Sequence, residues 1–300
     1  MDIVKLMPAT KDYLWGGCRL KEAGKPIQGD VLAECWELSF HPDGPCRIAS
    51  GPEIGKTLKE VATQEDIGER ASRFPFFPVL IKLIDSAGNL SVQVHPSDAY
   101  ALKNENSFGK TEMWHILHAE KGAGLYVGLK KKTSLEEIRE AVNNDTIMSL
   151  LNFYEVQPGE SYFIPSGTIH AIGKGVTLIE IQQNSNLTYR LYDYHRLGKD
   201  GKPRELHLEK ALKVIDTHPY HPLSFPSPII GECEYFVSER ISDLSIHPEP
   251  GSFISVTFVE GKGKLNGIPF AALDTFFLPA GKEATIEADE PVTYIKTFVR

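Results

Sequence analysis

The stretch at residues 89–96, which reads N-L-S-V-Q-V-H-P, places the strongest constraint on how this chain folds. Apolar and polar residues alternate within it: the apolar ones are Leu90, Val92 and Val94, and the polar ones are Ser91, Gln93 and His95. Side chains in a β-strand point alternately to opposite faces, so the pattern predicts a strand with one buried apolar face. The other face carries groups that are able to bind a ligand, and it therefore requires a functional explanation.

Two later segments offer partners for this polar face. Glu112 lies in the sequence G-K-T-E-M-W-H, and His170 ends the sequence P-S-G-T-I-H. Gln93 and His95 are two residues apart on one strand and point the same way, so with Glu112 and His170 they form a candidate shell of nitrogen and oxygen ligands for a divalent metal ion. His115 lies three residues after Glu112 on the same expected strand and should face the opposite side.

Composition indicates a β-rich globular protein. The chain has 300 residues, enough for one large or two medium domains, and 41% of them are hydrophobic. Its 20 prolines and 25 glycines favour many turns over long helices. The net charge of -8 is spread along the chain, apart from a short lysine run at residues 130–132, which argues against nucleic acid as a partner.

Cysteine usage and the amino terminus predict a cytoplasmic protein. The four cysteines form no C-x-x-C pair, and residues 1–5 lack the apolar segment of a signal peptide. Reduced thiols in the cytoplasm are the simplest explanation of this pattern. No apolar run approaches the roughly 20 residues that cross a bilayer, so no membrane partner is expected.

Periodicity and turn residues predict several more elements. Strands are expected at residues 34–39, 79–85, 110–117, 161–164, 170–172 and 176–182, and helices within residues 57–71, 97–103, 133–151 and 205–215. Lys82 interrupts the apolar strand at residues 79–85, and burying an unpaired ammonium costs several kcal/mol. Lys82 is therefore expected either to reach the sheet edge or to meet an anion. Near the amino terminus, Tyr13 and Trp15 precede a Gly-Gly turn and form either a lid over the first sheet or ordinary packing.

The chain is expected to form two β units joined by a linker. Residues 1–217 form the first unit, the Pro- and His-rich residues 218–229 the linker, and residues 230–300 the second unit. The sequences E-K-G-A-G-L and I-P-S-G of the first unit have counterparts in E-G-K-G-K-L and L-P-A-G of the second. The second copy lacks the histidine that follows the turn, so only the first unit is expected to carry metal chemistry.

The spacing of Gly159, Pro165, Gly167 and His170 resembles the second conserved motif of the cupin superfamily, although Lys174 stands where that family usually has Asn. This resemblance implies an all-β fold of two cupin (jelly-roll) barrels with short helical insertions. The metal-free residues 230–300 then form a degenerate second barrel.

A more specific resemblance covers essentially the whole chain. The sequence L-S-V-Q-V-H-P-S-D, followed by G-K-T-E-M-W and later by Q-Q-N-S-N-L-T-Y-R, is similar to the short bacterial form of type I mannose-6-phosphate isomerase. This implies one zinc ion per chain, with the ligands Gln93, His95, Glu112 and His170. It also implies a catalytic Arg190, a place for Lys110 in the active site, and positions near the substrate phosphate for Ser91 and Lys82.

The implied reaction interconverts mannose 6-phosphate and fructose 6-phosphate by moving a proton between C2 and C1. An enediolate has to be stabilised and a base has to be positioned. Arg190 is suited to neutralise the developing oxyanion or to clamp the substrate, and the structural alternative is an ion pair with Asp193. Lys110 and Glu180, which lies on an inward strand face, are both candidates for the base.

Two alternative functions use the same residues. An iron-dependent cupin dioxygenase would also have His and Glu ligands, but it gives no reason for the grouping of Lys82, Ser91 and Arg190. A sugar-phosphate-binding cupin without enzymatic activity would bind the sugar without turnover, and the presence of Lys110 and Arg190 argues against it. Under the isomerase interpretation the partner is a small sugar phosphate, and the chain is expected to be a monomer or a homodimer.

Overall fold

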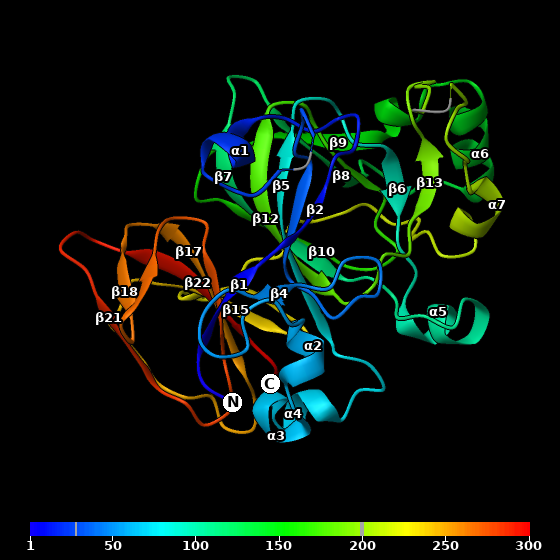
Figure 1. Ribbon diagram of the computed structural model, residues 1–300. Helices are drawn as coiled ribbons and strands as arrows, with labels where there is room; N and C mark the ends of the chain where they lie inside the picture. The colour runs from blue at the N-terminus through cyan, green and yellow to red at the C-terminus, as the bar shows by residue number, and fades with distance from the viewer. Residues whose placement is uncertain (28, 199–200) are drawn as a thin grey trace.

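The computed structural model describes residues 1–27, 29–198 and 201–300, and four antiparallel sheets dominate it (Figure 1). The prediction of a mostly β protein is confirmed. In the described part of the chain, none of the helices combines the length and the apolar character needed to cross a membrane.

A six-stranded sheet forms the centre of the first unit. Its strands, in spatial order, are β10 (Ser161–Ile164), β7 (Glu112–Ala119), β12 (Val176–Gln183), β5 (Val79–Ser86), β3 (Glu34–Leu38) and β2 (Ala9–Lys11). All eight residues of β12 are buried, because its two faces contact different hydrophobic clusters. Leu178 packs with Trp114, whereas Ile179 packs in a cluster that includes Phe236 of the C-terminal unit. The strand predicted at residues 176–182 is therefore present, and neither of its faces meets solvent.

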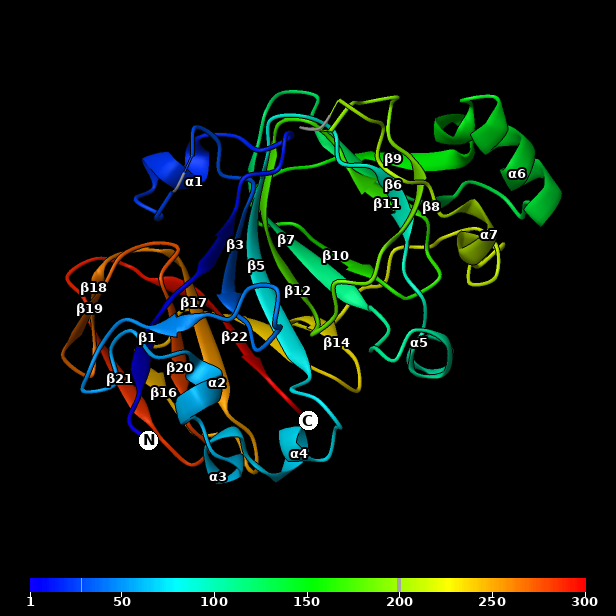
Figure 2. The same cartoon turned by 45° about the vertical axis from the view of Figure 1, so that its right-hand side comes forward.

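A five-stranded sheet faces the inner side of that sheet (Figure 2). Its strands are β13 (Tyr189–Tyr192), β6 (Val92–Val94), β11 (His170–Ile172), β8 (Gly124–Leu129) and β9 (Leu151–Glu155). In β6, Val92 and Val94 are fully buried while Gln93 between them is half-buried, as the alternation predicts. The polar side of β6 is therefore directed towards the space between the two sheets, where Gln93 lines a cavity.

The C-terminal unit is built from two further sheets. The seven-stranded sheet contains β14 (Ile229–Glu232), β15 (Val237–Ile241), β22 (Thr293–Phe298), β17 (Ile254–Glu260), β20 (Thr275–Leu278), β1 (Val4–Met7) and β4 (Arg47–Ile48). The four-stranded sheet contains β16 (Ser245–Ile246), β21 (Ala284–Glu287), β18 (Gly263–Leu265) and β19 (Ile268–Phe270). Strands β1 and β4 come from the start of the chain, and Val4 pairs with Phe277. The amino-terminal segment thus completes a sheet made mostly of C-terminal strands, while the predicted boundaries at residues 217 and 230 stay predictions.

The helices are short excursions from the sheets. They are α1 (Arg19–Glu22), α2 (Leu58–Val61), α3 (Gln64–Ile67), α4 (Glu69–Ser72), α5 (Asp98–Asn104), α6 (Leu135–Asn143), α7 (Leu208–Ala211) and a 3-10 helix at Ile147–Leu150. Side chains of Thr57, Thr63 and Ser134 form reciprocal capping boxes that satisfy the free amides at the starts of α2, α3 and α6.

The helix predicted over residues 205–215 is wrong in extent, since α7 covers only Leu208–Ala211. The backbone amide of His207 donates to the carbonyl of Arg190 at 2.7 Å, and the amide of Arg190 donates to His207 Nδ1 at 3.2 Å. These bonds fix residue 207 beside β13, so the helix begins only after it.

Candidate metal centre and substrate cavity

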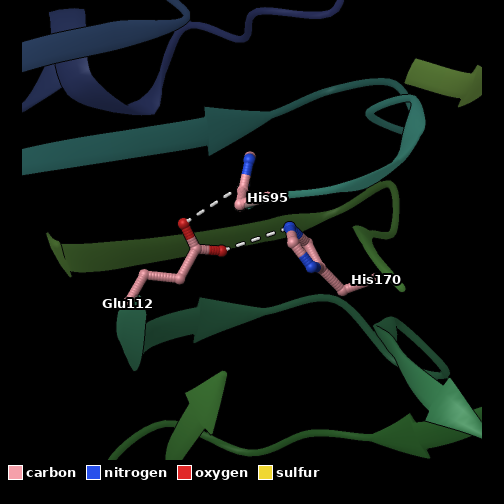
Figure 3. A group of neighbouring side chains, drawn as sticks. All are labelled: His95, Glu112 and His170. Carbon is pink, nitrogen blue, oxygen red and sulfur yellow. Dashed lines mark ion pairs between the residues drawn. The ribbon is translucent and has the colours of Figure 1, made fainter. Parts of the chain in front are cut away.

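Three side chains converge in the interior of the first unit: His95, Glu112 and His170 (Figure 3). His170 opens β11 and pairs in register with Gln93 of β6, while His95 follows directly after β6. Glu112 is the first residue of β7 in the opposite sheet. The two facing sheets therefore bring together residues that are up to 75 positions apart, as the sequence predicted.

The cluster is deeply buried and compact. The two histidines are 1% exposed and Glu112 is 0% exposed, and one possible ligand atom from each lies within 4.8 Å of the others. Glu112 Oε1 lies 3.2 Å from His170 Nε2, and Glu112 Oε2 lies 3.6 Å from His95 Nε2. His115 lies outside the cluster and contacts Ser161 Oγ at 2.9 Å through Nδ1, in agreement with the prediction that it faces the other way.

Backbone carbonyls determine which histidine nitrogens point at Glu112 without a proton. His95 Nδ1 lies 2.9 Å from the carbonyl oxygen of Leu187, and His170 Nδ1 lies 2.9 Å from that of Thr168. A carbonyl only accepts hydrogen bonds, so each Nδ1 carries the proton and donates it. In the neutral rings both Nε2 atoms then direct lone pairs towards the carboxylate. This arrangement of outer hydrogen bonds is the usual support for a metal-binding histidine.

Electrostatics keeps both rings neutral. Burial, reinforced by the nearby Lys110 ammonium, lowers the pKa of His95 well below its usual value and that of His170 to about 4. Burial raises the pKa of Glu112 to about 8, with the charge of Lys110 opposing this rise. Glu112 Oε1 has no hydrogen-bond partner among the described residues and faces the lone pair of His170 Nε2 at 3.2 Å, an arrangement that is poorly stabilised without a cation. A divalent cation at their centre satisfies all three groups, so the donor set fits a metal site.

Gln93 lies beside this cluster, with its amide nitrogen 3.3 Å from His170 Nε2. Amide oxygen and nitrogen are exchanged by a half-turn of the side-chain amide group, so either atom is able to face the centre. Gln93 is therefore placed where a fourth ligand would be expected.

A network of ion pairs continues from the cluster to the adjacent strands. Lys110 forms a short ion pair with Glu112 and lies 3.3 Å from His95 Nε2 and 3.6 Å from Glu180. Glu180 also contacts Lys82 at 3.1 Å and accepts a hydrogen bond of 3.1 Å from Trp114 Nε1. Burial by itself would raise the pKa of Glu180, but the two ammonium groups hold it at about 2. Glu180 is thus an ionised carboxylate on the inward face of β12.

Lys82 meets anions, which is one of the two outcomes predicted for a buried lysine in an apolar strand. Besides Glu180 it has Glu34 at 3.8 Å, and its ammonium lies 5.0 Å from the centre of the Trp36 ring. Burial favours the neutral amine, but the charges of Glu34 and Glu180 prevail and raise the pKa of Lys82. Its ammonium group is therefore charged and held in position.

A cavity of about 270 Å³ adjoins the cluster. Eight of its lining residues carry charges or amide groups: Glu34, Lys82, Gln93, Lys110, Glu180, Asn186, Arg190 and Arg204. Tyr13 and Trp15 also line it, so the aromatic pair near the amino terminus forms part of the cavity wall. Sequence reasoning did not identify Glu34 or Arg204, because Glu34 lies in an ordinary strand pattern and Arg204 in a loop without a motif.

Arg190 and Ser91 form one wall of the cavity. Arg190 Nε donates to Ser91 Oγ at 3.3 Å, and its Nη1 donates to the carbonyl of Glu205 at 2.9 Å. The structural alternative for Arg190, an ion pair with Asp193, finds no support among the described residues, since Asp193 pairs with Arg196 and Arg204. Burial, reinforced by the neighbouring Arg204, lowers the pKa of Arg190.

The fold and the site together define a class: a mostly β protein with a buried candidate metal centre beside a polar cavity rich in cationic groups. A family model described as phosphomannose isomerase type I, catalytic domain, matches residues 3–111. The Bacillus subtilis protein named probable mannose-6-phosphate isomerase GmuF is 37% identical over 94% of this chain and 95% of its own length. Mannose-6-phosphate isomerase ManA of the same organism is 35% identical, over 91% of this chain and 92% of its own.

A solved structure gives the same result. The crystal structure of the mannose 6-phosphate isomerase from Bacillus subtilis superimposes with a TM-score of 0.87 at 33% identity and covers 99% of both chains. The chain belongs to the mannose-6-phosphate isomerase family, whose members are aldose-ketose isomerases. The family predicted from the sequence motifs is confirmed.

Proposed function

We propose that this chain interconverts mannose 6-phosphate and fructose 6-phosphate with one zinc ion held by His95, Glu112, His170 and Gln93. The observation that carries the proposal is the buried cluster of two neutral histidines and one carboxylate beside a cavity lined by cationic groups. Two imidazoles, a carboxylate and an amide suit zinc, which takes mixed nitrogen and oxygen ligands in catalytic sites. Family membership favours this function over a dioxygenase or a binding protein.

A bound zinc ion supplies a Lewis acid that polarises an oxygen of the open-chain sugar near C1 and C2. The residues around it have complementary tasks. Arg190 lines the cavity and keeps its charge at all working pH values, so it is suited to stabilise the oxyanion of an enediolate or to hold the substrate. Ser91, which accepts a hydrogen bond from Arg190, retains its own hydroxyl proton for the substrate.

Lys110 and Glu180 are the two candidates that move the proton between C2 and C1. Both line the cavity, and their charged groups lie 3.6 Å apart. Glu180 is ionised and so is able to accept a proton, whereas its two ammonium neighbours weaken it as a base. Lys110 lies closer to the metal ligands, with its Nζ 3.3 Å from His95 Nε2.

We further propose that the four sheets form two cupin barrels. The six- and five-stranded sheets would form the catalytic barrel within residues 1–217, and residues 230–300 with β1 and β4 would form the second, joined by residues 218–229. Support comes from the layered arrangement of the sheets and from the location of the candidate metal ligands in, or directly next to, strands of the first pair of sheets. The second barrel then supports the first by packing.

The test combines metal analysis with an activity assay. Purified protein is expected to contain about one zinc ion per chain, to lose turnover of mannose 6-phosphate after chelation and to regain it when zinc is added. Glu112→Gln keeps the side-chain volume but removes the charge, so it should lower zinc content and activity together. His115→Gln, a buried change three residues along the same strand, is the matched control and should keep both. Bound zinc without turnover of mannose 6-phosphate would contradict the proposed function.

A further inference from the structure

The positive groups that line the cavity differ in how they are neutralised. Lys82 and Lys110 are surrounded by the carboxylates of Glu34, Glu112 and Glu180. Each of the two ammonium groups therefore already has carboxylate partners within 4 Å. A phosphate dianion beside Lys82 would also meet the carboxylates of Glu34 and Glu180, which repel it, although that lysine carries a positive charge.

A second group of charges, which we call the arginine group, consists of Arg190, Arg196, Arg204 and Asp193; Arg190 and Arg204 line the cavity, and Asp193 pairs with Arg196 and Arg204. Asp193 is 5% exposed, and its carboxylate oxygens accept from Arg204 Nε at 2.7 Å and from Arg204 Nη2 at 2.5 Å. Arg196 Nη2 donates to the same carboxylate at 2.5 Å. Three guanidinium groups and one carboxylate leave these four side chains with a net positive charge of two.

Arg204 is the member of this group that is both fixed and available. Its guanidinium is engaged by Asp193 along the edge formed by Nε and Nη2. A guanidinium has five N–H donors in a planar fork, so the edge formed by the two Nη atoms is able to bind a second oxyanion at the same time. Arg204 lines the cavity beside Arg190 and Ser91, which places that oxyanion within the cavity.

Asp193 also ties the arginine group to the strand that carries the metal ligands. Arg196, held by Asp193, donates from Nη1 to the backbone carbonyl of Asn89 at 2.5 Å. Asn89 lies four residues before Gln93. One buried carboxylate thus fixes the position of Arg204 relative to β6 and to the candidate metal centre.

We propose that Arg204, positioned by Asp193, contacts the phosphate group of the substrate and determines the preference for phosphorylated over unphosphorylated hexose. The assignment deepens the proposed function and rests on it. The substrate then lies with its phosphate at the arginine group and its C1 and C2 ends at the metal centre. Asp193 acts through Arg204 and is a positioning residue.

Arg204→Ala and Arg204→Lys test the assignment through two readouts. With mannose 6-phosphate, Arg204→Ala should raise KM about 10- to 100-fold while kcat changes less than about threefold, because the phosphate lies away from the reacting carbons. The constant for competitive inhibition by inorganic phosphate should rise by the same factor. Arg204→Lys should recover part of both, and zinc content should stay unchanged.

Arg139→Ala is the matched control, because Arg139 also pairs with a carboxylate, that of Glu209, but on the surface of α6. It should leave KM and phosphate inhibition unchanged. Asp193→Asn should raise KM less than Arg204→Ala does, and its effect should disappear when Arg204 is already Ala, because the two residues act as a unit. Unchanged inhibition by phosphate in Arg204→Ala would overturn the assignment and leave Arg204 as a structural ion-pair partner of Asp193.

Direct binding of inorganic phosphate, measured by calorimetry on the zinc-loaded protein, separates this assignment from the proposed function. If the wild-type protein binds phosphate and Arg204→Ala binds it at least tenfold more weakly, the assignment stands even when mannose 6-phosphate is not turned over. If both bind phosphate equally well, the assignment fails even when the enzyme is an isomerase.

Discussion

At the scale of single residues, the main question is which of Lys110 and Glu180 transfers the proton. Both side chains touch the cavity, and each is held by charges of opposite sign. If each side chain served only to neutralise the charge of its neighbours, the two residues would have equivalent roles. The chemistry separates them, because only the residue that carries the proton between C2 and C1 should control the rate of the chemical step.

Substitution of each candidate base should reveal which one transfers the proton. Glu180→Gln and Lys110→Met each replace a candidate base by a neutral side chain of similar size. Whichever substitution removes the true base should lower kcat by about 100-fold or more, since general base catalysis contributes about that much. The partner residue, if it only positions the base, should change kcat by less. Steady-state kinetics on zinc-loaded variants measures this, and full turnover by Lys110→Met would remove Lys110 as the base.

Sequence reasoning found the candidate metal cluster because strand alternation fixes which side chains share a face. Gln93 and His95 are two apart, and Glu112 and His170 stand in recognisable motifs, so local pattern and family resemblance were sufficient. Arg204 was missed because its place beside the cavity depends on a pairing with Asp193 eleven residues earlier in an irregular loop. The periodicity of apolar residues does not predict an ion pair between two side chains of an irregular loop.

At the scale of elements, β7 shows how one strand serves two environments. Glu112 points into the first unit, whereas His115 points to the other face, where burial and the charge of Arg240 lower its pKa to about 4. An exposed histidine has a pKa of about 6.5, so the folded protein keeps His115 neutral over a range in which the unfolded chain is protonated. His115 in β7 therefore makes the stability of the folded protein sensitive to acid.

The sign of the resulting pH dependence is fixed. As the pH falls from about 6.5 towards 4, the unfolded chain takes up a proton at residue 115 that the folded protein does not, so the free energy of unfolding decreases. The contribution reaches about 3 kcal/mol near pH 4. Urea unfolding at pH 7 and pH 5 should show a smaller loss of stability in His115→Gln than in the wild type. Equal losses in both would show that His115 does not titrate in this way.

Element boundaries depended on contacts that the local sequence does not reveal. The short helices at residues 57–71 were predicted from the spacing of apolar and charged residues and were found as α2, α3 and α4. The helix around residue 208 was predicted too long, because its first residues are bound to β13 through His207. Helix propensity identified the segment, and a tertiary hydrogen bond set its start.

At the scale of the whole molecule, one hydrophobic cluster joins the two units. It contains Ile81 and Ile179 from the six-stranded sheet together with Phe236, Phe253 and Ile295 from the C-terminal unit. The amino-terminal strand β1 strengthens this link by pairing with β20. A shared core of this kind predicts that the two units unfold together.

Phe236→Ala tests this cooperativity. The residue is fully buried in the shared cluster, so the change should lower the free energy of unfolding by about 3 to 5 kcal/mol. All three tryptophans, Trp15, Trp36 and Trp114, lie in the first unit, so their fluorescence reports on that unit alone. The fluorescence and far-ultraviolet circular dichroism transitions should shift equally, and the exposed Phe153→Ala should shift neither. A shift of the circular dichroism transition without a shift of the fluorescence transition would show that the units unfold separately.

Local sequence patterns predicted two β units, but they did not predict that the amino-terminal strand pairs with a strand of the second unit. The repeated E-K-G and I-P-S-G type segments indicated a duplication, and the four sheets are consistent with it. The pairing of Val4 with Phe277 spans nearly the whole chain, and a short amphipathic strand carries no mark of its distant partner. The pairing partner of the amino-terminal strand therefore could not be predicted from the sequence and is known only from the structure.

The most direct test of the central claim is to follow the sugar itself. Zinc-loaded protein is mixed with mannose 6-phosphate, and proton nuclear magnetic resonance records the sugar signals with and without a chelator. The account predicts that fructose 6-phosphate signals grow to a constant ratio, and that neither the chelated protein nor Glu112→Gln produces them at a comparable rate. Unchanged mannose 6-phosphate signals in the presence of fully zinc-loaded protein would contradict it.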